Sequence, residues 1–333
     1  MFVAANRWNV NGKTIVEHET LSLESAIKLN REIRDENIES LATCSQNYNP
    51  CTCNMDTANA NAITVTCVNA DPALIKSAFG RSTDLSIYKF ELYHTTVPTT
   101  TVILPADLLS DKKVSYIHIG CSKTDGTCPM IPLKIDPDAF RFTRRYTLEF
   151  HLKHVSFDST STFGFLSGME AVTTFTMDNY QQIPGAAFEI APFNTMIAMT
   201  TMAFTNGRDT SLGSLSFPDI TPVKLLSFNL TGNNLEYNDI NGRILLSLSG
   251  STSATTIEYF GLGGNALNLV PNRLQSFSKV KVLEMGSNSI PYITQSRLNF
   301  PTPPTSVDLQ KNAIKSIDVG AFVGMFINFI CIV

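Results

Sequence analysis

The chain has 333 residues, of which 43% are hydrophobic and 16% are charged, and its formal net charge is -4. This balance is that of a folded protein, and the weak net charge gives no indication of a nucleic-acid-binding surface or an acidic tail. No apolar run reaches the ~18 residues that a membrane-spanning helix needs.

Residues 1–43 are predicted to be an N-terminal extension that is either partly helical or disordered. Leu23 and Ile27 are four residues apart within a segment rich in charged residues, which is compatible with a short amphipathic helix. The extension lacks a basic start followed by an apolar core, so it does not have the pattern of a secretory signal peptide. We prefer the interpretation that Met1 is not the natural start; a genuine cytosolic extension is the alternative.

The seven cysteines form two close groups and one isolated residue, Cys331. Close groups of this kind indicate disulfide bonds and an oxidising compartment. A zinc site is the weaker alternative, because C-x-C lacks the usual gap between ligands and no histidine lies nearby. The first group has the spacing C-x6-C-x-C-x13-C and contains Cys44, Cys51, Cys53 and Cys67; the second, Cys121 and Cys128, is predicted to close a loop by its own disulfide.

Residues 84–322 contain a repeated pattern that is clearest near the C-terminus. Three successive copies follow the template L-x-x-L-x-L-x-x-N-x-L, apart from Pro304 at the first apolar position of the last copy, and this template marks a leucine-rich repeat. Weaker copies upstream extend the array to about eight to nine repeats. We therefore predict an α/β fold, a right-handed solenoid with one parallel strand per repeat. The middle apolar position of each strand is assigned to Phe90, Ile117, Phe150, Phe175, Met199, Phe228, Phe260, Leu283 and Val307.

A second pattern, I-x-x-x-A-F, recurs downstream of the strands. An aromatic residue or a leucine there is expected to fill the core on the convex side, where a short helix or turn closes each coil. Residues 236–256 are longer than an ordinary return path and carry apolar residues at helical spacing, so we predict a convex-side helix there. The copies are Ile135–Phe140, Ile183–Phe188 and Ile317–Phe322, with a looser one at Leu104–Leu109.

Residues 323–333 form an apolar tail that is too short to span a bilayer. No cysteine-rich cap follows the last repeat, although its apolar edge needs cover. We expect the chain to be truncated within a repeat here, which would leave Cys331 unpaired. The alternative is that the tail folds back as an improvised cap.

The asparagine of the template has a predicted structural role. A buried amide needs hydrogen-bond partners, and a ladder of amides can satisfy the free backbone groups of adjacent coils. We therefore expect inward-pointing side chains that form a ladder, with no catalytic role, at Asn233, Asn265, Asn288 and Asn312.

The candidate binding face lies on the concave side, near the N-terminal end of the array. His118 and His151 occupy the same outward position on adjacent strands, which are about 4.8 Å apart. A metal site or a pH-sensitive patch is one interpretation of this pair, and an ordinary solvated surface is the other. Tyrosines are frequent anchors of protein interfaces. The candidate face therefore comprises Tyr88, Glu91, Tyr93, Tyr116, His118 and His151.

The outward row that contains the two histidines continues along the whole array. Asn229 in this row begins the N-glycosylation sequon Asn229-Leu-Thr231 and is predicted to be exposed. The complete predicted row is Glu91, His118, His151, Thr176, Thr200, Asn229, Gly261, Glu284 and Asp308.

The cysteine spacing of residues 44–83 resembles the amino-terminal cap of extracellular leucine-rich repeat proteins, which covers the apolar edge of the first repeat. That resemblance implies the disulfide pairs Cys44–Cys53 and Cys51–Cys67. With its Cys-Thr-Cys cap and its I-x-x-x-A-F copies, the span Cys44–Phe322 is similar to secreted arthropod proteins of the kind that includes the non-catalytic subunit of Oplophorus-luciferin 2-monooxygenase. This resemblance implies a non-catalytic role.

No nucleophile elbow, P-loop, zinc-protease motif or kinase motif set is present in a suitable context. We therefore expect no enzyme activity and no cofactor, and predict extracellular recognition of a protein partner, whose identity the sequence does not reveal. The alternatives are a non-catalytic subunit that stabilises an enzyme of the luciferase-type monooxygenase class, and a fragment of an innate-immune receptor ectodomain.

Overall fold

The computed structural model describes residues 44, 48–55, 62–121, 128–158, 161–182, 191–207, 223–322 and 329–331. All of them belong to one compact unit, Ser40–Val333. The N-terminal extension of residues 1–43, predicted to be partly helical or disordered, and the I-x-x-x-A-F copy at 183–188 lie outside the described residues.

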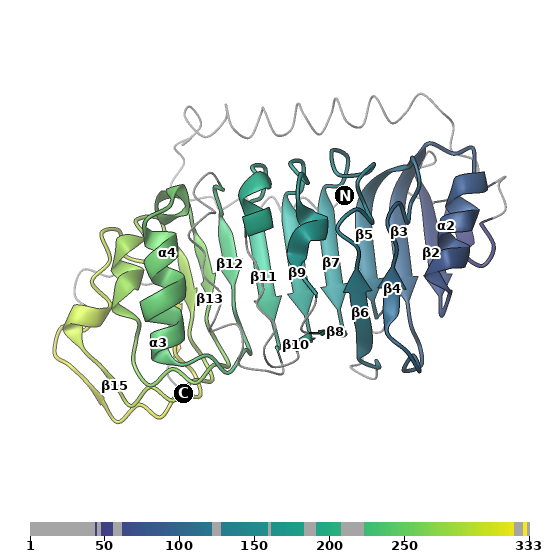
Figure 1. Cartoon of the computed structure of the whole chain (residues 1–333). Helices are drawn as coiled ribbons and strands as arrows, with labels where there is room; N and C mark the ends of the chain where they lie inside the picture. Colours follow the sequence, from purple (N-terminus) through teal and green to yellow (C-terminus); the bar gives the residue numbers. More distant parts are fainter. Residues whose placement is uncertain are drawn as a thin grey trace. The chain divides into compact units, whose positions relative to one another are not determined.

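The described residues form a 12-stranded main sheet in which neighbouring strands are parallel, except for the antiparallel pair at its N-terminal end (Figure 1). Each coil contributes one strand, so the predicted α/β solenoid is confirmed. The strands, in spatial order, are β1 (Thr52–Met55), β2 (Ile63–Val68), β3 (Ser86–Tyr93), β5 (Lys113–Gly120), β7 (Glu149–Lys153), β9 (Thr174–Asp178), β11 (Thr201–Thr205), β12 (Ser227–Asn229), β13 (Tyr259–Gly261), β14 (Val282–Glu284), β16 (Ser306–Asp308) and β18 (Phe329–Cys331).

The register of the main sheet aligns the inward apolar residues of successive coils. Phe175 pairs with Phe150 on one side and with Met202 on the other. The prediction that Met199 occupies this row is wrong. Met196, Met199 and Met202 are spaced three apart and all buried, so apolar pattern alone cannot choose between them. As a consequence, Ala203 and not Thr200 stands in the outward row beside Thr176.

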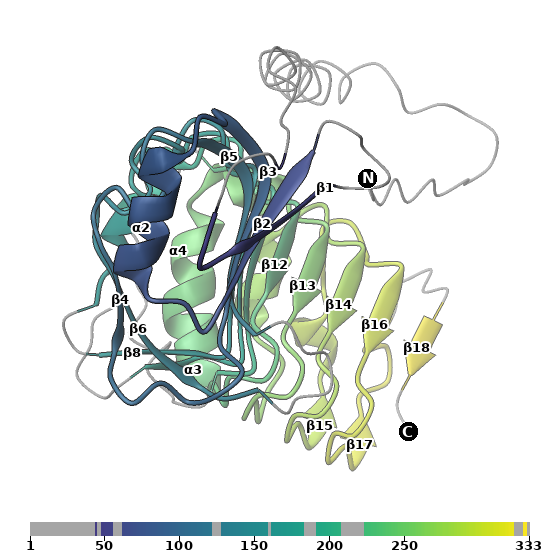
Figure 2. The same ribbon diagram turned by 90° about the vertical axis from the view of Figure 1, so that its right-hand side faces the viewer.

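A second parallel sheet of four strands was not predicted. It consists of β4 (Val102–Leu104), β6 (Ile131–Ile135), β8 (Val155–Phe157) and β10 (Gln181–Gln182), and Figure 2 shows the first three on the same side of the main sheet as the helices. Leu104 and Ile135 end β4 and β6, where turns or short helices were expected. The I-x-x-x-A-F copies therefore begin on strands. Ile317 likewise ends β17 (Ser316–Ile317), which pairs with β15 (Tyr292–Ile293).

Helical segments close the remaining coils. The helix predicted within residues 236–256 is confirmed as the continuous run α3 (Tyr237–Asp239), η4 (Ile240–Ile244) and α4 (Leu245–Ser249). Its residues Ile240, Ile244, Leu245 and Leu248 are fully buried. Short 3-10 turns occur before this run at η1 (Phe163–Leu166) and η2 (Ala191–Thr195), and after it at η5 (Thr252–Thr255), η6 (Asn272–Ser276) and η7 (Gln295–Arg297).

The N-terminal end of the main sheet is covered by a helix that was not predicted, α2 (Pro72–Arg81). The side chain of Asp71 caps it by accepting a hydrogen bond from the backbone N–H of Ala73 at 2.9 Å, and Pro72 suits its first turn. Ile75, Ala78 and Phe79 bury their side chains against the core. Disulfides join Cys44 to Cys53 and Cys51 to Cys67, which are the pairs that the resemblance implies, and a third joins Cys121 to Cys128.

Asparagine side chains link adjacent C-terminal coils by hydrogen bonds. The Asn265 oxygen accepts hydrogen bonds from the backbone N–H groups of Asn233 at 3.1 Å and Leu235 at 3.0 Å. Its amide nitrogen donates to the backbone oxygens of Leu230 and Leu262. Asn288 and Asn312 repeat this pattern.

The ladder begins where the second sheet ends. Tyr180 stands at the position equivalent to Asn233, five residues after the inward residue of its strand, and donates its hydroxyl to the Asn233 oxygen at 2.6 Å. β10 follows immediately after Tyr180. In addition to the main sheet, successive coils are therefore joined by the second sheet on the N-terminal side of this point, and by the asparagine amides and the β15–β17 pair on the C-terminal side.

A residue in the left-handed region ends most strands of the main sheet, four positions after the inward residue. Asn179 has φ of 48° and Asn206 has φ of 55°, values that asparagine tolerates better than most residues. Gly232 and Gly264 take the same place in later coils. Each coil thus leaves the sheet through the same backbone turn.

Three residues of the predicted apolar tail are described, Phe329–Cys331, and they form β18. β18 pairs in parallel with β16, and Ile330 aligns with Val307. The described residues 329–331 therefore continue the main sheet.

Candidate binding site on the polar face

The main sheet has one apolar and one polar face. Phe90, Ile117 and Phe150 point into the core and are fully buried. The opposite face, here called the polar face, was predicted to be concave and carries two aligned outward rows. The first is Glu91, His118, His151, Thr176, Ala203, Asn229, Gly261, Glu284 and Asp308; the second is Thr64, Lys89, Tyr116, Glu149, Thr174, Thr201, Ser227, Tyr259, Val282 and Ser306.

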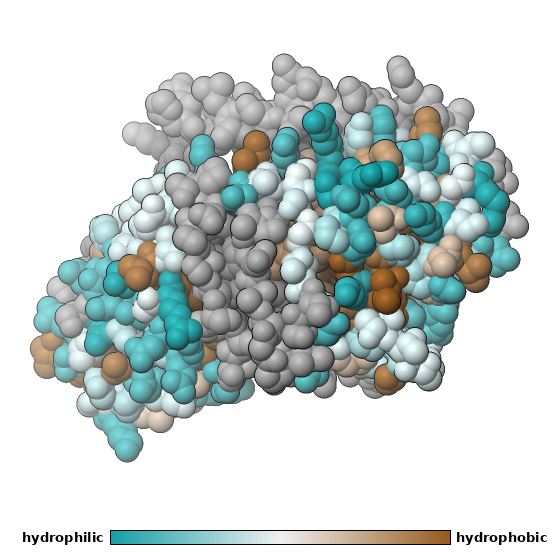
Figure 3. Space-filling model, in the orientation of Figure 1, coloured by the Kyte–Doolittle hydropathy of each residue, from teal (hydrophilic) through white to brown (hydrophobic). Residues whose placement is uncertain are grey.

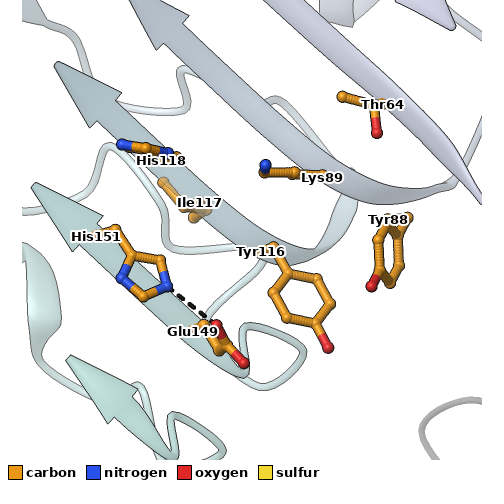
Figure 4. Close-up of a pocket in the computed structure, with 8 residues that line it drawn as sticks. All are labelled: Thr64, Tyr88, Lys89, Tyr116, Ile117, His118, Glu149 and His151. Atoms are coloured by element: carbon orange, nitrogen blue, oxygen red, sulfur yellow. Dashed lines mark hydrogen bonds and ion pairs between the residues drawn. The ribbon is translucent and has the colours of Figure 1, made fainter. Parts of the chain in front are cut away.

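A hollow of about 500 Å³ lies on the polar face, across β2, β3, β5 and β7 (Figure 4). Four residues of the predicted face line it: Tyr88, Tyr116, His118 and His151. The other lining residues are Thr64, Lys89, Ile117 and Glu149.

Two predicted face residues, Glu91 and Tyr93, support the hollow from outside its lining. The Tyr93 side chain is 7% exposed, so its ring offers no contact surface, contrary to the prediction. Its hydroxyl lies 3.3 Å from His118 Nδ1. Glu91 forms an ion pair with Lys89 and accepts a hydrogen bond from the Thr66 hydroxyl at 2.9 Å. Burial alone would raise the pKa of Glu91, but hydrogen bonds from Lys89, Tyr93 and Thr66 bring it below its usual value.

Sequence reasoning missed Thr64 and Lys89 as parts of the site. Thr64 lies in the cap, where no strand was predicted, although the alternation of Ile63-Thr-Val-Thr-Cys-Val68 indicates one. Lys89 precedes the inward Phe90 and pairs with Tyr116 on the next strand. The signal for Lys89 was therefore present in the predicted register.

The two histidines have different surroundings. Their ring centroids are 6.0 Å apart. His151 places Nδ1 2.7 Å from the Thr176 hydroxyl and Nε2 3.0 Å from a Glu149 carboxylate oxygen. Burial, followed by the nearby His151, lowers the pKa of His118 to about 4. His118 is therefore uncharged at neutral pH.

We expect the stability of the protein to fall between pH 6.5 and about 4 in a way that depends on His118. In this range the unfolded chain takes up a proton on His118 more readily than the folded chain does, so acid favours unfolding. The stabilisation is complete above pH 6.5 and is lost as pH falls through the folded pKa. A pKa difference of this size corresponds to about 3 kcal/mol of unfolding free energy.

Urea unfolding at several pH values, compared between the wild type and His118→Asn, measures this contribution. The lowered pKa of His94, also caused by burial, adds its own slope to both proteins, so the difference between the two curves is decisive. Parallel curves would contradict the assignment.

The described residues contain no group of three or more His, Cys, Asp or Glu side chains arranged to hold a metal ion. The pair His118 and His151, although adjacent, belongs to no such group. Within the same part of the chain, no helix combines the length and the apolar character needed to cross a membrane.

The strand register, the asparagine ladder and the recurring turn define a leucine-rich repeat solenoid. No model of a known protein family matches the chain, and no curated protein matches its sequence. Among solved structures, internalin C2 from Listeria monocytogenes is 16% identical over 53% of this chain and 77% of its own, with a TM-score of 0.36. A chain of the Toll–Spatzle complex from Drosophila is 13% identical over 85% of this chain, with a TM-score of 0.43. This chain spans about half of that one, 53%. The assignment of the fold rests on the geometry of this chain.

Proposed function

We propose that the chain is a non-enzymatic scaffold that binds a protein partner through its polar face, with the hollow as the centre of contact. The observation that carries the proposal is the hollow itself. Three of its side chains are partly exposed: Tyr88, Tyr116 and His151. The core is packed by the inward residues that alternate with them, so these three are not needed to fill the core. Aromatic side chains gathered in a depression are typical anchors of protein interfaces. The proposal includes no catalysis and no cofactor.

We place this function outside the cell. Three disulfides support an oxidising compartment, because cytosolic thiols are kept reduced. Asn229, on the polar face, is proposed as a glycosylation site. Its side-chain oxygen accepts a hydrogen bond from the Thr231 N–H at 2.9 Å within the sequon.

Two narrower roles would use the same face. One is a non-catalytic subunit that stabilises an enzyme of the luciferase-type monooxygenase class, which is the role that the resemblance of the cysteine cap and the I-x-x-x-A-F copies implies. The other is part of an innate-immune receptor ectodomain. Stable co-purification with an enzyme chain from the natural source supports the first role, and binding of a secreted signalling protein supports the second.

The opposite side of the unit provides a control surface. Figure 3 shows that side, with mixed polarity and an apolar patch over β4 and β6. Ile103 in β4 is 57% exposed and pairs with Lys134 of β6. A partner that binds through nonspecific hydrophobic contact alone would bind at this apolar patch.

We expect peptides selected from a random display library on the folded chain to bind the hollow. The double variant Tyr88→Ala/Tyr116→Ala should weaken them at least ~10-fold, because an interface anchor contributes about 2 kcal/mol or more. Ile103→Ser should leave their affinity unchanged. Titration calorimetry with each selected peptide measures both effects. Peptides that lose affinity with Ile103→Ser and keep it with the tyrosine variant would refute the proposal.

A further inference from the structure

The hollow contains an acceptor group that the fold leaves partly unused. A carboxylate can only accept hydrogen bonds, so the proton between His151 Nε2 and Glu149 belongs to the histidine. That contact engages Oε2 of Glu149. The other oxygen, Oε1, has no hydrogen-bond partner among the described residues, and the side chain is 38% exposed.

Two aromatic rings stand beside this carboxylate. Tyr116 pairs directly with Glu149 across β5 and β7. The rings of Tyr88 and Tyr116 are 4.6 Å apart and tilted by 52°, so they form a wedge rather than a closed stack. Figure 4 shows the Tyr116 ring between Tyr88 and Glu149, with the two hydroxyls and the carboxylate directed toward the same side.

The charges around the hollow leave Glu149 as the acidic group available to a ligand. The ammonium group of Lys89 is matched by the carboxylate of Glu91, which is 13% exposed. His118 carries no charge at neutral pH, because burial holds its pKa near 4. A cation that enters the hollow beside Glu149 therefore meets that carboxylate and the Tyr116 ring, while the Lys89 ammonium, which also lines the hollow, is already paired with Glu91.

We propose that the hollow holds the guanidinium group of an arginine side chain from a protein partner, stacked on the Tyr116 ring and paired with the Glu149 carboxylate, while Tyr88 packs against the other side of Tyr116. This inference rests on the proposed function and names the chemistry of the contact. A guanidinium group is planar, stacks on tyrosine faces and donates to a carboxylate in a fixed geometry. A lysine side chain has the same charge, but it lacks a planar group that can stack on tyrosine and the paired N–H donors that match a carboxylate. Arginine should therefore bind more tightly than lysine.

Small probes test this chemistry on the full-length chain. Acetyl-arginine methylamide is titrated against protein with ¹³C-labelled tyrosine, alongside the lysine, citrulline and glutamate analogues and a methyl glucoside. We expect the arginine probe to shift the resonances of Tyr88 and Tyr116, assigned by single substitution. The neutral citrulline probe, which keeps the shape without the charge, should bind at least ~10-fold more weakly, as should glutamate.

Glu149→Gln should weaken the arginine probe about 10-fold and remove its preference over citrulline. The matched control is Glu284→Gln, which removes another carboxylate beside a tyrosine on the polar face, where the Tyr259 hydroxyl donates to Glu284. It should leave the shifts of Tyr88 and Tyr116 unchanged. Thermal unfolding verifies that each variant is folded, and Tyr116→Leu provides a second test if Glu149→Gln is unstable.

The outcomes separate this inference from the proposed function. Equal binding of arginine and citrulline, or shifts produced by glutamate or the glucoside and not by arginine, would overturn the inference. If selected peptides still require Tyr88 and Tyr116, the proposed function survives that result. Peptides indifferent to the hollow would refute the proposed function whatever the arginine probe does.

Discussion

Replacing Asn265 by alanine is expected to lower the free energy of unfolding by about 3–5 kcal/mol, because each buried polar group left without a partner costs about 1–3 kcal/mol. The Asn265 side-chain oxygen accepts hydrogen bonds from the backbone N–H groups of Asn233 and Leu235. Its amide nitrogen donates hydrogen bonds to two backbone oxygens. Asn265 is 7% exposed, so water cannot easily replace the amide.

Asn312 provides the matched control for this prediction. It makes the same kinds of hydrogen bond but is half-buried, so water can take the place of its amide. Asn312→Ala should cost about 1–2 kcal/mol. Urea unfolding followed by circular dichroism measures the unfolding free energy of both variants. Equal losses would show that the contribution of a ladder asparagine to stability does not depend on its burial.

A second large loss, about 3–5 kcal/mol, is expected for Phe175→Ala. Phe175 is fully buried, and its ring centroid lies 5.1 Å from that of Phe193 and 5.7 Å from that of Phe204. Phe150 and Phe163 complete the cluster. Removing the central ring leaves a cavity and abolishes edge-to-face contacts worth about 0.5–1.5 kcal/mol each.

Phe142→Ala is the control for this cavity. Phe142 is 47% exposed, and its ring contacts the Arg141 guanidinium, with 4.7 Å to the centroid. Its loss should cost less than about 1 kcal/mol. Differential scanning calorimetry on both variants provides the comparison. A similar small effect for Phe175→Ala would mean that neighbouring rings refill the space.

The main sheet could be predicted because its inward residues repeat in a fixed register. Phe150 and Phe175 align in the structure as they do in the repeat template. The second sheet could not be predicted in this way. Its strands have only two to five residues, and the alternation of β4, β6 and β8 is too short to distinguish a strand from a turn. The choice of Met199 instead of Met202 was likewise made on a signal too weak to fix the position.

The adjacency of His118 and His151 followed from the register alone. The burial of Tyr93 did not. Tyr93 has an outward position, but it pairs with Gly120, which has no side chain, and its ring leans against His118 with 5.2 Å between centroids. Whether an outward side chain is exposed depends on its neighbours, and the repeat template does not contain that information.

The contacts of the asparagine ladder make its coils interchangeable modules. Asn265 and Asn288 each bond only to their own coil and to the one before it. A coil of this kind can be duplicated or removed and still find the same partners on either side. The coils of β3, β5 and β7, which carry most of the hollow, lack this freedom, since each contributes a particular strand to the second sheet. Changes in the length of such a protein should therefore accumulate in its C-terminal half, while recognition stays tied to the N-terminal coils.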